Sequence, residues 1–227
     1  DIRVSGVRAT RATVSWITDI PKQGYIDYGP TAALGNRADH VDGSAYEGNV
    51  HYYVLTGLEP STTYYFTIVH DGMTFDDEGQ PFTFTTGPVL EPAVGSDVAY
   101  GRILIRNGID PAAGALVYLS LRDADGMGTT GGSGTVCVRT DTNGYWQYEM
   151  ANFRTTDASA YFSYSPAADT LTVSAVSNVG HRGYFEDSTA NTFPAGSLTV
   201  YPNRPPELDP ISDITVSEGQ TVTLTPS

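Results

Sequence analysis

Hydrophobic and polar residues alternate along most of the chain in short runs of the kind that β-strands produce. Residues 12–19 place Val14 and Trp16 on one face of such a run, and residues 63–69 repeat the pattern. The runs are rich in Val, Ile, Thr and Tyr and are separated by Gly, Pro, Asn and Asp. This pattern is typical of antiparallel β-sandwiches. Helical periodicity is nearly absent, so we predict an all-β fold.

Proline-containing stretches divide the chain. Residues 86–97 carry Pro88 and Pro92, and residues 201–210 carry four prolines, which cannot run through the centre of a sheet. We therefore predict two tandem antiparallel β-sandwiches and a C-terminal strand segment. The predicted segments are 1–88 (first sandwich), 89–96 (linker), 97–202 (second sandwich) and 203–227 (Pro-rich lead and strand segment).

The first segment carries three features in a particular order. These are the strand with Trp16, the Tyr-Gly pair at 28–29, and a corner formed by Leu58, Pro60 and Tyr64. In this combination the segment resembles a fibronectin type III domain. The resemblance implies a structural role for Tyr64, whose hydroxyl ties the preceding turn while its ring packs.

Similar domains precede the catalytic domain of purple acid phosphatases and occur among secreted glycoside hydrolases. The metal-binding Asp, His and Asn motifs of those phosphatases are not found in this sequence. Because these motifs are missing, any such enzyme would have to lie outside this sequence. A fold alone does not assign a function.

The second segment has a Gly-Arg-Ile strand at 101–103, Gly-Ala-x-Val at 114–117 and Thr-Asp-x-x-Gly-Tyr at 140–145. These motifs resemble a carboxypeptidase regulatory-type, prealbumin-like domain. Members of that family are mostly spacers and folding partners without catalysis. In the turn at 140–145 we expect Asn143 and Gly144 to supply positive φ angles.

A glycine-rich loop at residues 123–134 allows three interpretations. Gly126, Gly128 and Gly131 spell a dinucleotide fingerprint, but that motif needs a following helix, and the next residues read as a strand. Asp123 and Asp125 could contribute to a calcium site, although two carboxylates fall short of a full coordination sphere. We favour a flexible connection between strands and leave calcium open.

No constellation for catalysis is visible. The single cysteine, Cys137, alternates with valines and is expected to be a small buried hydrophobe. The four histidines, His40, His51, His70 and His181, are far apart in sequence and lack zinc-ligand spacing. We therefore predict a protein that is not an enzyme and has no cofactor and no metal.

The formal net charge is −14, and Lys22 is the only lysine. Without a basic cluster, nucleic acid is a poor partner, and no apolar run is long enough for membrane insertion. We expect an extracellular or cell-surface location. Because the sequence starts at Asp1, we expect a processed protein or a piece of a longer one.

Residues 204–227 resemble the opening strands of a cadherin-like or immunoglobulin-like domain. Their predicted apolar face consists of Ile214, Val216, Val222 and Leu224. This face could pair with the remainder of a third domain, with the second sandwich, or with a neighbouring copy. We favour the neighbouring copy, because strand donation from one copy to the next builds a fibre.

The sequence thus predicts a non-enzymatic extracellular structural or adhesive protein, with self-association into a filament as one outcome. The alternative is an accessory spacer or glycan-binding module of a larger secreted hydrolase. In that case Tyr161 and Tyr164 could offer an aromatic platform to glycans. The expected partners are therefore copies of the chain, neighbouring domains or glycans.

Overall fold

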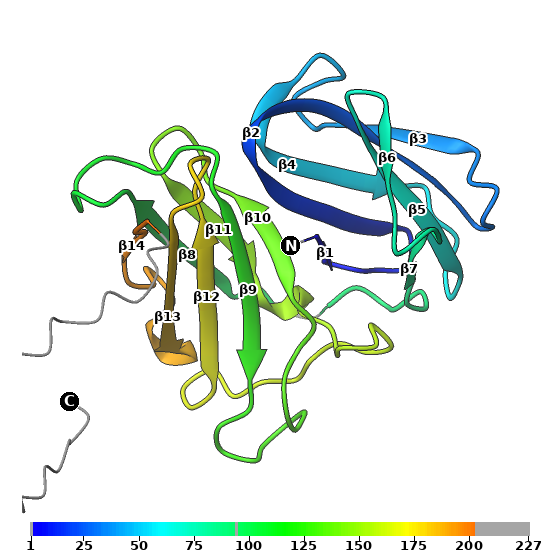
Figure 1. Cartoon of the computed structure of the whole chain (residues 1–227). Helices are drawn as coiled ribbons and strands as arrows, with labels where there is room; N and C mark the ends of the chain where they lie inside the picture. The colour runs from blue at the N-terminus through cyan, green and yellow to red at the C-terminus, as the bar shows by residue number, and fades with distance from the viewer. Residues whose placement is uncertain (1, 94, 203–227) are drawn as a thin grey trace, which may run out of the picture.

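The computed structural model describes residues 2–93 and 95–202, which form two β-sandwiches packed side by side (Figure 1). The described residues are almost entirely strands and loops, with two single-turn 3₁₀ helices at Met150–Asn152 and Thr189–Asn191. The predicted all-β class is confirmed. The strands of the first sandwich are β1 (Arg3–Ser5), β2 (Arg11–Gly29), β3 (Asn36–Asp39), β4 (Glu47–Thr56), β5 (Thr63–His70), β6 (Met73–Phe75) and β7 (Phe82–Thr85).

The long strand β2 serves both sheets of the first sandwich. Its first half pairs with β1 and β4, and its second half pairs with β3 and β5. The pairing with β4 changes register between Ile17 and Lys22, where the strand passes from one sheet to the other. Val14 and Trp16 are buried in the core between the sheets, as the alternation predicted.

The corner before β5 is closed by Tyr64. The backbone N–H of Glu59 donates to the Tyr64 hydroxyl at 2.9 Å, and the ring packs against Phe84 with centroids 5.8 Å apart. The structural role implied for Tyr64 is therefore confirmed.

We expect Tyr64→Phe to lower the free energy of unfolding by about 1 kcal/mol, because the Glu59 N–H loses its acceptor. Urea denaturation measures this loss. Tyr65→Phe, on the opposite face of the same strand, is the matched control and should change stability by less than about 0.5 kcal/mol. Equal stabilities for the two variants would contradict the role of the hydroxyl.

The second sandwich consists of a four-stranded and a three-stranded sheet. The four-stranded sheet has the order β10-β9-β12-β13 and is antiparallel, and the other has the order β11-β8-β14. In the second sheet β14 runs parallel to β8, a local exception to the antiparallel prediction. The strands are β8 (Val98–Leu104), β9 (Leu116–Arg122), β10 (Val136–Arg139), β11 (Tyr145–Glu149), β12 (Thr170–Val176), β13 (Arg182–Ser188) and β14 (Leu198–Thr199).

The turn before β11 differs from the prediction in one residue. Gly144 has a φ of +80°, but Asn143 is not among the described residues with positive φ. The Asp141 side chain instead shapes the turn, because its Oδ1 accepts from the N–H groups of Asn143 and Tyr145, each at 2.8 Å.

Candidate functional site

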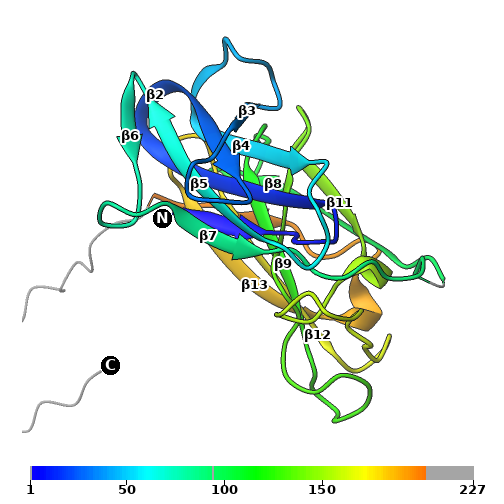
Figure 2. The ribbon, with the colours of Figure 1, turned by 90° about the vertical axis from the view of Figure 1, so that its right-hand side faces the viewer.

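The two sandwiches share a buried contact surface. Strand β9 is covered on both faces: Val117 and Leu119 belong to the core of the second sandwich, whereas Leu116 and Tyr118 belong to a cluster that it shares with the first. In Figure 2, seen from the right of Figure 1, the first sandwich lies over the second. The shared cluster consists of Val50, Leu116, Tyr118, Cys137 and Val176, with Ile17 and Tyr52 packed against it.

Two hydrogen bonds and one ion pair cross this contact surface. The hydroxyls of Ser15 and Tyr118 lie 2.9 Å apart in a buried position, and the Tyr52 hydroxyl donates to the Cys137 carbonyl at 3.0 Å. At the rim, Arg139 pairs with an Asp42 carboxylate oxygen at 2.7 Å. Directional bonds therefore join the two sandwiches at several separated points.

Cys137 lies within this shared cluster. It is 5% exposed, and burial raises the pKa of its thiol to about 12. Because the thiolate is the reactive form, this cysteine acts as a small hydrophobe, as predicted.

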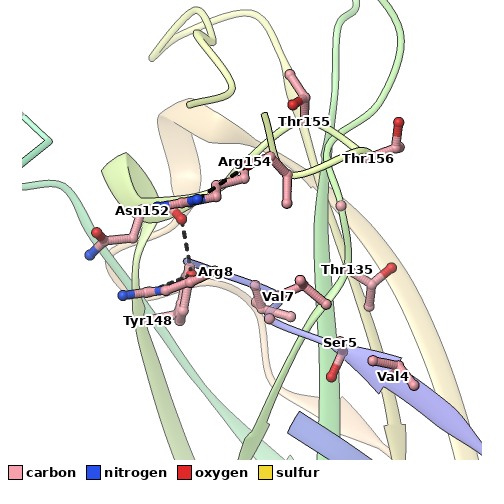
Figure 3. A pocket seen from close by; sticks show the side chains of 14 residues that line it. Val4, Ser5, Val7, Arg8, Thr135, Tyr148, Asn152, Arg154, Thr155 and Thr156 are labelled. Carbon is pink, nitrogen blue, oxygen red and sulfur yellow. Dashed lines mark hydrogen bonds between the residues drawn. The ribbon is translucent and has the colours of Figure 1, made fainter. Parts of the chain in front are cut away.

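A cavity of about 90 Å³ opens at one end of the contact surface (Figure 3). Arg8 from the first sandwich donates through Nη2 to the Tyr148 hydroxyl at 3.2 Å, and this hydroxyl donates to the Asn152 carbonyl at 3.3 Å. Arg154 from the second sandwich donates through Nη1 to the Pro88 and Ala158 carbonyls at 3.1 and 3.2 Å. Two guanidinium groups from different sandwiches therefore line one small space.

The pKa values of the residues that line the cavity reflect their burial and the closeness of the two guanidinium groups. Burial lowers the pKa of Arg154, and the nearby positive charge of Arg8 lowers it further. Burial raises the pKa of Tyr148. The like charges of Arg8 and Arg154 repel each other, and a negative charge between them would offset this repulsion.

In the glycine-rich loop, Asp123 and Asp125 meet a third carboxylate. Asp169, at the end of the connection before β12, completes a group whose ligand atoms lie within 4.8 Å of one another. Asp169 is fully buried, and its two oxygens accept from the N–H groups of Ala124 and Ser165 at 2.9 and 2.8 Å.

The other two carboxylates also accept backbone hydrogen bonds. Asp123 Oδ1 accepts from Gly126 at 2.7 Å, and Asp125 Oδ1 accepts from Met127 at 2.8 Å. The strand β10 follows the loop, which agrees with the rejection of a nucleotide fingerprint. The loop was expected to be a flexible connection, but these hydrogen bonds hold its backbone in place. Each of the three carboxylates accepts backbone hydrogen bonds, so each has a structural role in the loop.

Three of the four histidines lie together at one end of the first sandwich, although they are far apart in sequence. His51 stacks on Trp16 with ring centroids 4.9 Å apart, and His70 lies 4.6 Å from His51. His40 stacks on Tyr46 at 3.7 Å. Among the residues that the structure describes, only Asp123, Asp125 and Asp169 bring three metal-ligand atoms within 4.8 Å of one another. The histidines instead make ring contacts with their aromatic neighbours.

These histidines are neutral in the fold. Burial lowers the pKa of His40 to about 4 and that of His51 to about 3, and it also lowers the pKa of His70. Each ring has a buried nitrogen without a hydrogen-bond partner, namely His40 Nε2, His51 Nδ1 and His70 Nε2. A proton on these rings would therefore be poorly accommodated.

The two tyrosines considered for glycan binding have other contacts. Tyr164 packs against the core of the second sandwich, and its hydroxyl donates to Asp97. Tyr161 lies under the Arg154 guanidinium, 5.6 Å from it. The pair does not form one open platform, and a glycan partner stays a prediction.

The predicted donated face, Ile214, Val216, Val222 and Leu224, lies outside the described residues. Within the described ranges, no helix has the length and apolar character needed to cross a membrane.

Three solved structures show weak similarity. The FN1–FN3 domains of chicken CNTN1 match with a TM-score of 0.27 and 16% identity over 88% of this chain. The Yersinia pseudotuberculosis adhesin InvE matches with a TM-score of 0.24 and 15% identity over 80%. Pullulanase from Anoxybacillus sp. LM18-11 matches with a TM-score of 0.22 and 10% identity over 81%. The chain covers 64%, 55% and 25% of these structures, less than two thirds of each.

No curated protein matches the sequence. Residues 1–86 match the family model of the purple acid phosphatase N-terminal domain, which covers less than half of the chain. This family is one of those named from the sequence as carrying such a domain, and the matched residues span all strands of the first sandwich. The first sandwich is therefore fibronectin type III-like, and its sequence is similar to the N-terminal domain of purple acid phosphatases.

Proposed function

We propose that this chain is a non-enzymatic extracellular module that holds two β-sandwiches at a fixed angle, as a rigid spacer in a larger structural or adhesive protein. The observation that carries the proposal is the buried surface around Tyr118 and Cys137. A flexible tether between domains would not need a strand buried on both faces. The resemblance of the second sandwich to a prealbumin-like spacer domain supports the same role.

Nuclear magnetic relaxation of the full chain tests this proposal. We expect one rotational correlation time for both sandwiches. Replacing Tyr52 and Tyr118 together by Ser removes both interface rings and the hydroxyl contacts at the centre, and the sandwiches should then tumble separately. Tyr145→Ala, which removes an exposed tyrosine from β11, is the matched control. Two distinct correlation times in the unmodified protein would overturn the rigid spacer.

The second candidate is an accessory module of a larger secreted hydrolase. It is favoured by the match of residues 1–86, because that family is the N-terminal domain of an enzyme. The reading frame that encodes this segment distinguishes the two candidates. A catalytic domain in the same frame supports the accessory module, and further β-domains alone support the structural protein.

Filament assembly by the C-terminal strand, with its cadherin-like or immunoglobulin-like pattern, belongs to the structural candidate. Its donated face would be Ile214, Val216, Val222 and Leu224. Deleting residues 204–227, or replacing Val216 and Val222 by Asp, should abolish filaments in electron micrographs. Filaments of unchanged length would contradict strand donation.

A further inference from the structure

The cavity between the sandwiches carries positive charge without a matching acid. None of the 14 residues that line it is Asp or Glu, yet both Arg8 and Arg154 are among them. Within the described part of the chain, neither of these two arginines forms an ion pair. By contrast, Lys22, Arg37, Arg122 and Arg139 each pair with an Asp or Glu.

Two hydrogen-bond donors at this cavity have no partner. Arg154 Nε and Ser5 Oγ are both buried and make no hydrogen bond, and Ser5 is only 3% exposed. Ser5 lies in β1 of the first sandwich, whereas Arg154 belongs to the second. Buried donors without partners are costly, so their presence points to a group that supplies acceptors.

We propose that this cavity binds a small oxyanion, which accepts hydrogen bonds from Arg8 and Arg154 and so links the two sandwiches. A volume of about 90 Å³ admits several water molecules or one small anion. It is far below the 300–1,000 Å³ or so of pockets for larger organic ligands. The ligand class is therefore phosphate, sulfate or a short carboxylate. This binding role goes beyond that of a spacer.

The surrounding charge sets a limit on the affinity. Asp157 lies two residues beyond Thr155, which lines the cavity, and its carboxylate is held by the Thr155 and Ser159 hydroxyls. These hydrogen bonds lower the pKa of Asp157 to about 2, so it is ionised at neutral pH. Most of the remaining negative charge is screened within about 10 Å at 0.1 M salt.

The test is a titration of the full chain with sodium phosphate, sodium sulfate or sodium acetate, followed by the amide resonances of Gly134 and Thr155. Sodium chloride at equal ionic strength is the reference. We expect saturable shifts with phosphate and at least tenfold weaker binding in Arg8→Gln, because a charge-assisted hydrogen bond is lost. Arg106→Gln, which removes an exposed arginine elsewhere, is the matched control.

Asp157→Asn should tighten binding, because it removes a negative charge beside the lining residue Thr155. Saturation by phosphate and sulfate alone identifies a tetrahedral oxyanion, and saturation by acetate as well extends the class to carboxylates. A cavity that holds only water would show no saturable shift with any of the three salts. That result, or equal binding in Arg8→Gln and the unmodified chain, overturns the proposal, and the spacer role stands independently of it.

Discussion

Between pH 7 and about pH 5 the first sandwich is expected to lose roughly 2–4 kcal/mol of stability through His40 and His51. Their folded-state pKa values, about 4 and about 3, lie below the ordinary value of 6.5. The unfolded chain therefore binds more protons than the folded chain in this range. Stability is fully present above the unfolded pKa and falls as the pH drops toward the folded values.

The charged neighbours of the histidines do not reverse this direction. Asp42 favours a proton on His40, but Asp42 is paired with Arg139, whose charge acts in the opposite sense. Around His70 the charges of Asp71 and Lys22 oppose each other in the same way. Burial remains the largest cause for each ring.

Urea denaturation at the two pH values measures the effect, and His51→Phe is the comparator. Phenylalanine retains a ring to stack on Trp16 but cannot take up a proton. About half of the pH-dependent loss should disappear in this variant. Most carboxylates do not titrate above pH 5, so they do not mimic the effect. A wild-type stability that is equal at both pH values, or unchanged pH dependence in His51→Phe, would contradict the prediction.

Features that depend on neighbouring residues could be predicted from the sequence. The alternation predicted that Val14 and Trp16 lie in the core, because every second side chain of a strand points to the same face. The corner at Tyr64 was predictable for a similar reason, since the tyrosine and the N–H group that it accepts from are five residues apart.

The contact between the sandwiches was missed, although the sequence contains a signal for it. Residues 116–121 are hydrophobic at nearly every position, which indicates burial on both faces. In an antiparallel sandwich one face of such a strand must then be covered by something other than its own core. The first sandwich covers it here.

The grouping of His40, His51 and His70 had no such local signal. His40 follows β3, His51 lies within β4, and His70 is the last residue of β5. Only the pairing of these three strands with β2 brings the histidines to one end of the sandwich. The same holds for Arg8 and Arg154, which come from different sandwiches. Spacing rules for metal or catalytic motifs cannot detect groups that topology alone assembles.

Asp169→Ala is expected to lower the free energy of unfolding by about 2–4 kcal/mol. The buried carboxylate accepts from Ala124 in the glycine-rich loop and from Ser165 in the segment before β12. Alanine removes the acceptor of both of these partly buried hydrogen bonds, at a cost of about 1–2 kcal/mol each. Asp169→Asn should be intermediate, because the amide keeps one acceptor but turns a donor toward the other N–H.

Asp125→Asn is the matched control, because Asp125 is exposed and serves only the local turn through Met127. Its effect should stay within about 0.5 kcal/mol. Chemical denaturation gives the three free energies, and amide exchange at Ala124 and Ser165 reports whether the two segments separate. If Asp169→Ala proved no more destabilising than Asp125→Asn, the carboxylate would not be the tie between these segments. The expected order would instead make the Asp169 carboxylate a structural tie between the glycine-rich loop and the segment before β12.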